Sequence, residues 1–217
     1  MKKPKINSVK STQRYVVLDV ETTGLLPWKG DRVIEIGAVA IEGGDLMDEF
    51  STLIQAPRAI PFSASQIHGI TDEMLIGRPT PEEVFPALDA FIRDSILVAH
   101  NAQFDLAFLR REYELLGIRF SQRHICTLEM SRNRFPHLRN HKLETVYRHI
   151  IGTNGINGEG GLMRQEHDIG LQGGHDWISV GNPDRVPRSG TPKRKQTHRA
   201  LDDARMVAAI WLAMEGK

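Results

Sequence analysis

The apolar positions of this sequence first occur in short runs typical of β-strands, and later at the spacing of α-helices. Residues 14–20 form a β-branched run that predicts a buried first strand, and residues 32–41 and 49–55 predict a second and a third. Gly43 and Gly44 separate the last two runs and indicate a turn. The N-terminal part of the chain is therefore expected to form an antiparallel meander.

Helical spacing recurs from there to the end of the chain. In the last segment Val207 and Trp211 fall on the apolar side of an expected helix. A short apolar run at residues 95–99 predicts a fourth strand between helices. Helices are predicted over residues 63–68, 71–75, 80–91, 104–116, 143–150 and 201–214.

A long glycine-rich stretch separates the last two helical segments. Residues 152–190 hold 10 of the 19 glycines of the chain. A structureless loop of that length is unusual inside a compact domain. We therefore interpret residues 14–217 as a single domain with a glycine-rich insertion at about residues 152–195, preceded by a flexible basic lead-in at residues 1–13.

Composition narrows the class of protein. The chain has 217 residues, a formal net charge of +1 and one cysteine, Cys126, which excludes a polycationic protein and an intrachain disulfide. Any nucleic acid must therefore be bound by local basic patches. No apolar run approaches the roughly 20 residues that span a bilayer, and the N-terminus lacks the apolar core of a secretory signal. A cytoplasmic protein without a membrane partner is expected.

Two carboxylates end the first predicted strand. Because alternate residues of a strand point to the same face, Asp19 and Glu21 project together. Two neighbouring carboxylates repel each other and are costly to desolvate, unless a divalent cation lies between them. Mg²⁺ and Mn²⁺ prefer such oxygen ligands. Taken alone, the pair is better explained by a solvated strand end that carries two incidental acids.

Three segments resemble the motifs of the DnaQ-like, DEDDh family of 3′–5′ exonucleases. Residues 19–24 read DVETTG and match DxETTG, residues 100–105 read HNAQFD and match HNAxFD, and residues 198–203 read HRALDD and match HxAxxD. A chance match to all three in the correct order is improbable. The resemblance covers most of residues 15–150 and 197–214, and it does not cover the insertion.

The resemblance implies an α/β, RNase H-like fold, in which helices flank a mixed five-stranded sheet with its first three strands antiparallel. The fifth strand is then expected near residues 123–127. It also implies two divalent metal ions, Mg²⁺ or Mn²⁺, and a general base. The implied metal ligands are Asp19, Glu21, Asp105 and Asp203, and the implied base is His198.

Two of these residues have simpler alternatives. Asp105 stands at the start of a predicted helix, where a carboxylate also complements the helix dipole. His198 precedes the last helix and, considered alone, reads as a surface histidine. Asp202 points elsewhere on that helix and is interpreted as a solvated acid.

The resemblance also implies contacts to the terminal nucleotide. Here Phe104 has the alternative of a core residue, and His68 that of a structural turn histidine. Glu35 either orients the site or is an ordinary satisfied polar residue. The expected substrate-binding residues are Thr22, Thr23, Gly24, Leu25, His68, His100, Asn101 and Phe104.

The implied substrate is a nucleic acid with a free 3′ end, of which single-stranded or frayed DNA is preferred, with release of nucleoside 5′-monophosphates. RNA or a short oligonucleotide is the alternative substrate, and a catalytically silent nucleic-acid-binding module is the alternative function. Residues 185–199 contain six Lys or Arg and no acid, which favours either a phosphate-binding arm or a solvated linker. A polymerase or another protein partner is expected to dock through the insertion.

Overall fold

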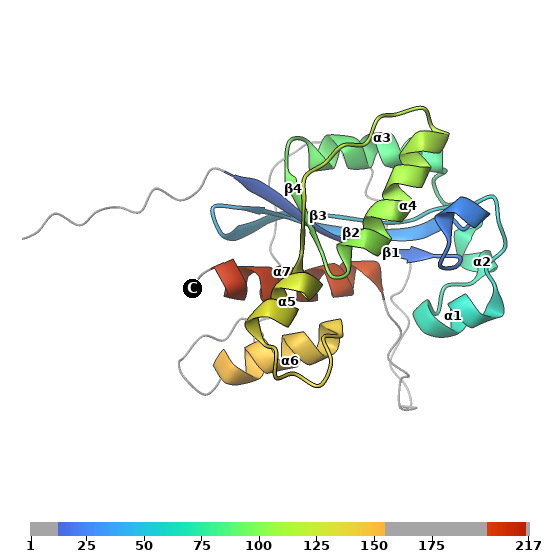
Figure 1. Ribbon diagram of the computed structural model, residues 1–217. Helices are drawn as coiled ribbons and strands as arrows, with labels where there is room; N and C mark the ends of the chain where they lie inside the picture. Colours follow the sequence, from blue (N-terminus) through green and yellow to red (C-terminus); the bar gives the residue numbers. More distant parts are fainter. Residues whose placement is uncertain (1–12, 155–198, 216–217) are drawn as a thin grey trace, which may run out of the picture.

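The computed structural model describes residues 13–154 and 199–215 (Figure 1). Residues 1–12, 155–198 and 216–217 lie outside this part of the chain. The predictions for the lead-in, for most of the insertion and for His198 therefore fall outside the described residues. No helix in the described part is long and apolar enough to cross a membrane.

A mixed sheet of five strands, in the order β3-β2-β1-β4-β5, forms the centre of the domain. The first three strands are antiparallel, and β4 and β5 continue the sheet in parallel with β1. This confirms the predicted α/β, RNase H-like architecture. The strands are β1 (Arg14–Thr22), β2 (Val33–Glu42), β3 (Asp45–Leu53), β4 (Ile96–Ala99) and β5 (His124–Cys126).

Helices cover both faces of this sheet (Figure 1). Helices α3 and α4 pack on one face, and α7 packs on the other with α6 against it. The short helices α1 and α2 cover the start of β2 through Ile34. The helices are η1 (Pro27–Lys29), α1 (Phe62–His68), α2 (Asp72–Leu75), α3 (Pro81–Ile92), α4 (Ala102–Leu115), α5 (Thr127–Arg134), α6 (Leu143–Asn154) and α7 (Ala200–Glu215).

The alternation of β1 separates these two layers. Val16 and Leu18 belong to the core cluster under α3 and α4, whereas Val17 packs with Val207 and Trp211 of α7. Successive residues of a strand point to opposite faces, so one apolar run supplies both cores. The side chain of Asp19 continues the series of Val17 and therefore lies on the α7 face at the end of the strand.

Two elements differ from the sequence prediction. Strand β3 begins at Asp45, four residues before the predicted start, because its first half is exposed and its pairing with β2 uses backbone groups alone. Helix α5 was not predicted, because it is polar and buries only Thr127 and Ser131. The periodicity of apolar residues therefore predicts neither the first half of β3 nor helix α5.

Helix α7 approaches the sheet closely where it begins. At Gly37 of β2 an added Cβ would overlap the backbone of Ala200 and Leu201. The absence of a side chain at Gly37 therefore sets the distance between α7 and the sheet. Because Asp203 lies in the first turn of α7, this contact also fixes the distance of Asp203 from the sheet.

Replacement of Gly37 by alanine is expected to destabilise the fold, because the new methyl group can only be accommodated by moving α7. The free energy of unfolding in urea should fall by about 1–3 kcal/mol or more. Gly152 of α6 is the matched control, since nothing lies within 4 Å of a Cβ added there. Gly152→Ala should instead raise stability by about 0.5–1 kcal/mol. Equal stability of Gly37→Ala and the unaltered chain would contradict the close approach.

Candidate active site

Three carboxylates meet at the end of the central strand. Asp19 and Glu21 project from β1, and Asp203 comes from the first turn of α7. One carboxylate oxygen of each lies within 4.8 Å of the others. Residues 184 positions apart in the chain are thus brought together, because α7 packs directly across β1 and β2. Oxygen atoms in this arrangement form a donor set for a hard divalent cation.

Asp105 is the fourth acid of the site. It lies in the first turn of α4 and is 2% exposed. Burial raises the pKa of its carboxyl to about 8, and the Glu21 carboxylate adds to this shift. Backbone groups of Val20 and of Asp105 itself partly oppose it. Asp105 thus belongs electrostatically to the group on β1, although it lies outside the tight cluster of three.

Asp19 has the most unfavourable environment for a negative charge. Burial raises its pKa well above the usual value, and repulsion from Asp105, Glu21, Asp203 and Glu35 raises it further. The protein alone therefore does not compensate the charge at this position. A divalent cation would do so, because it replaces mutual repulsion by attraction to each carboxylate. The residues present thus fit the metal ions that the sequence implies.

Hydrogen bonds within the loop after β1 fix its conformation. The Thr22 hydroxyl donates to the Gly24 carbonyl at 2.6 Å, and the Thr23 hydroxyl accepts from the Arg32 amide at 3.0 Å. The Asp31 carboxylate accepts from the Leu26 amide at 2.9 Å and would overlap any side chain at position 24. The expected contact residues Thr22 and Thr23 therefore shape the loop.

This loop presents Leu25 to solvent. Its side chain is 73% exposed, although the residues before it are buried or bonded internally. A large apolar side chain held outward on a braced loop is suited to contact a planar base. Leu25 is thus in a position compatible with its predicted role.

His68 has the contact of a structural turn histidine, and its contact to the terminal nucleotide stays a prediction. Its Nδ1 accepts a hydrogen bond from the Ile70 amide at 3.0 Å, which is a structural turn contact at the end of α1. Its buried Nε2 has no partner with hydrogen-bond geometry among the described residues. Burial lowers the pKa of His68, while the nearby Thr22 backbone and Glu35 oppose that shift. The neutral ring therefore keeps one N–H beside the site loop.

His100 and Asn101 adopt different roles. The His100 ring bonds through Nε2 to the His141 carbonyl at 2.8 Å and through Nδ1 to the Thr127 hydroxyl at 3.0 Å. Both nitrogens are used inside the protein, and burial lowers the pKa of the ring. His100 therefore joins β4, α5 and the following loop, and it has no ring nitrogen left for substrate. Asn101 instead is exposed, in the left-handed conformation with φ 72°.

Phe104 follows on α4 and is half-buried. Its ring packs against Phe108, with the ring centroids 5.0 Å apart. The side chain also borders the core cluster under α3 and α4. The interpretation as a core residue thus holds for one side of the ring, and its partial exposure leaves the contact to a terminal nucleotide as a prediction.

Two buried glutamates, which the sequence left undecided or unnoticed, position this site. Glu35 accepts from Nε and Nη2 of Arg199 at 3.0 and 2.8 Å, and from the Ala200 amide at 3.1 Å. It thereby fixes the first turn of α7. Glu112 of α4 accepts from Arg32 and from the Val33 amide, which fixes α4 to the start of β2. Both glutamates join segments that are distant in sequence, so no local pattern reveals them.

Comparison with known proteins agrees with this geometry. The sequence model of the RNase T exonuclease family matches residues 16–154. The DNA polymerase III epsilon subunit of Aquifex aeolicus is 36% identical over 144 residues, which cover 65% of this chain and 71% of that protein. This chain belongs to the DnaQ-type 3′–5′ exonuclease family. The family assignment confirms the resemblance found in the three motifs.

Other relatives of this exonuclease chain are much longer. The PolC-type DNA polymerase III of Thermotoga maritima is 37% identical over 199 residues, which cover 91% of this chain and only 12% of that protein. The exonuclease chain thus spans about one eighth of that relative.

Solved structures show the same fold. Exonuclease X in complex with 5′-overhanging duplex DNA superposes with a TM-score of 0.59 at 24% identity, covering 94% of this exonuclease chain and 92% of that one. The nuclease domain of 3′hExo, a DEDDh family member bound to rAMP, superposes with a TM-score of 0.63 at 15% identity, with the same two coverages.

Glu35→Gln is expected to loosen α7, because the neutral amide loses the ion pair with Arg199 in a buried position. The free energy of unfolding should fall by about 1–3 kcal/mol, given that Arg199 is partly exposed. Glu49 provides the control, since its bond to Arg205 also ties the sheet to α7 but is exposed on both sides. Glu49→Gln should change stability by less than about 0.5 kcal/mol. Equal effects of the two substitutions in urea unfolding would refute the special role of Glu35.

The raised pKa of Asp105 predicts an unusual dependence of stability on pH. With a metal chelator present, the free energy of unfolding should fall by on the order of 2–5 kcal/mol as pH rises from about 4 towards about 8. The reason is that the Asp105 carboxyl keeps its proton in the folded state over this range, whereas in the unfolded state it has already released it. Millimolar Mg²⁺ or Mn²⁺ should abolish the decline, and Asp105→Asn should flatten it. Thermal unfolding at several pH values measures this, and a pH-independent midpoint in chelator would contradict the assignment.

Proposed function

We propose that this exonuclease domain removes nucleotides one at a time from the 3′ end of a nucleic acid, with two divalent metal ions at its acidic cluster. Single-stranded or frayed DNA is the preferred substrate, and nucleoside 5′-monophosphates are released. The observation that carries the proposal is the meeting of Asp19, Glu21 and Asp203 within 4.8 Å, with the buried Asp105 beside them. The names of the relatives, which are DNA polymerase III proteins, support DNA over RNA.

Each acid has a part in the proposed reaction. Asp19 lies at the centre of the group and would contact both ions, while Glu21 and Asp203 would complete one site and Asp105 support the other. When bound, the ions lower the pKa of an attacking water and neutralise charge on the phosphoryl oxygens. His198 would accept the proton of that water, since an imidazole with an ordinary pKa near 6.5 does so at neutral pH.

The surroundings of the acids support binding of a chain end. Leu25, four residues after Glu21, and Asn101, four residues before Asp105, are exposed, and the neutral ring of His68 keeps an N–H near the Thr22 loop. The bond from Glu35 holds Arg199, the residue that follows His198 in sequence. Association with a polymerase or another protein is proposed from the names of the relatives, through the insertion that lies outside the described residues.

Asp203→Asn should abolish most exonuclease activity, because it removes one carboxylate of the cluster while keeping its size. With Mg²⁺ or Mn²⁺, shortening of a 5′-labelled single-stranded DNA should fall by on the order of 10²–10³-fold. Asp202→Asn is the control, since the neighbouring side chain is exposed and bonds only weakly to Arg205. It should keep activity within about twofold.

The same assay on matched DNA and RNA strands decides the substrate. Faster shortening of RNA than of DNA would show that RNA, and not DNA, is the preferred substrate. Binding without shortening by the unaltered chain, with both metals tested, would support the silent binding module and end the proposal of catalysis.

A further inference from the structure

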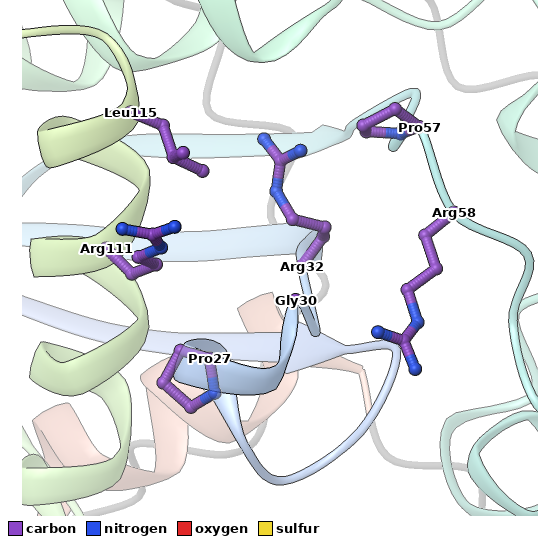
Figure 2. A pocket seen from close by; sticks show the side chains of 7 residues that line it. All are labelled: Pro27, Gly30, Arg32, Pro57, Arg58, Arg111 and Leu115. Atoms are coloured by element: carbon purple, nitrogen blue, oxygen red, sulfur yellow. The ribbon is translucent and has the colours of Figure 1, made fainter.

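A basic cavity of about 440 Å³ lies next to the loop that follows β1, and none of the four acids lines it. Figure 2 shows arginines reaching it from three parts of the fold: Arg32 from just before β2, Arg58 from the segment after β3, and Arg111 from α4. The remaining wall is formed by Pro27, Gly30, Pro57 and Leu115.

The acids that accompany these arginines stand outside the cavity lining. Glu112 holds Nε and Nη2 of Arg32 and is buried, so it fixes the guanidinium without facing the cavity. Asp31, which is mostly buried, binds Arg58 at 3.2 Å. The partner of Arg111 is Glu114, whose side chain is 70% exposed. An exposed pair of this kind is weak, so Arg111 is available to another anion.

This lining matches a phosphodiester in a strand. Guanidinium groups present planar forks of N–H donors that bind phosphate oxygens in pairs. The prolines and Leu115 add apolar surface of the kind that sugar and base edges contact. The volume also lies within the range of about 300–1,000 Å³ that is common for pockets of small ligands.

The position of the cavity relates it to the acids. Asp105 and Arg111 lie on the same helix six residues apart, which is roughly 9 Å along its axis. The cavity thus borders the same helix that carries Asp105 and the same loop that follows Glu21. Thr23 and Arg32 are also joined by two hydrogen bonds, one between their backbones and one from the Arg32 amide to the Thr23 hydroxyl, so the site loop and the cavity are parts of one rigid segment.

We propose that this cavity binds a phosphodiester group of the substrate strand, at a nucleotide that precedes the end that is cleaved. The inference rests on the proposed exonuclease function and deepens it, because it gives the domain a second contact to the strand. A strand long enough to reach the cavity is then held at two places, whereas a dinucleotide is held at one.

Steady-state kinetics on two substrates tests this. The ratio of KM for a strand of about twelve nucleotides to KM for a dinucleotide should rise about tenfold in Arg111→Ala, because one charge-assisted contact is lost. Arg111→Lys, which keeps the charge but lacks the fork, should give an intermediate ratio. Arg110→Ala is the matched control, since Arg110 is exposed on the same helix and does not line the cavity. It should change the ratio less than twofold.

Salt dependence gives a second readout. The slope of log KM for the longer strand against log salt should decrease by about one in Arg111→Ala and stay unchanged in Arg110→Ala. Equal ratios and slopes in the two variants, with both substrates cleaved, would overturn the proposal that the cavity binds a phosphodiester. The proposed exonuclease function would remain intact. Cleavage of neither substrate by the unaltered chain would overturn the proposed function, and this inference with it.

An acidic protein segment is the competing occupant. Binding of an oligoglutamate peptide that is lost in Arg111→Ala, together with unchanged kinetic ratios, would assign the cavity to such a segment and overturn the phosphodiester proposal.

Discussion

Repulsion among closely placed, partly or fully buried carboxylates is the constraint around which this domain is organised. The pKa of Asp19 is raised both by burial and by four neighbouring acids, so the chain holds these groups together against their own electrostatics. The sequence of β1 brings together only two of these acids, Asp19 and Glu21. The others depend on helices that are fixed from behind: α7 by Gly37 and Glu35, and α4 by Glu112. Much of the packing around β1 thus serves to keep like charges in contact.

Sequence patterns predicted what is local. Strand alternation placed Asp19 and Glu21 on one face, apolar runs located four strands, and the family resemblance located the fifth. Patterns failed where backbone or long-range contacts decide. The exposed first half of β3 pairs only through its backbone. Glu35 and Arg199, 164 residues apart, gave no local signal, because side-chain partners at that separation are set by tertiary packing.

The histidines of the site show the same limit. His100 lies in a complete motif, yet its ring nitrogens bond to Thr127 of α5 and to the His141 carbonyl in the loop before α6. The end of β4 lies beside the end of β5, where α5 begins. His68 lies in a less specific segment and keeps one ring nitrogen without a bonded partner among the described residues. The motif was thus stronger evidence for the residue that has no ring nitrogen left for substrate. The difference arises from which neighbours the parallel strands β4 and β5 bring to the ring, and the sequence does not encode that locally.

The buried and partly buried acids divide into two groups by their partners. Glu35, Glu112 and Asp31 each have an arginine, and each joins two segments of the fold. Among the described residues, no ion pair reaches Asp19 or Asp105, although these two have the most raised pKa values of the carboxyls. A buried carboxylate that stabilises structure needs a permanent counter-charge. Asp19 and Asp105 have no such counter-charge among the described residues, and this distinction separates these two acids from the three that join segments of the fold.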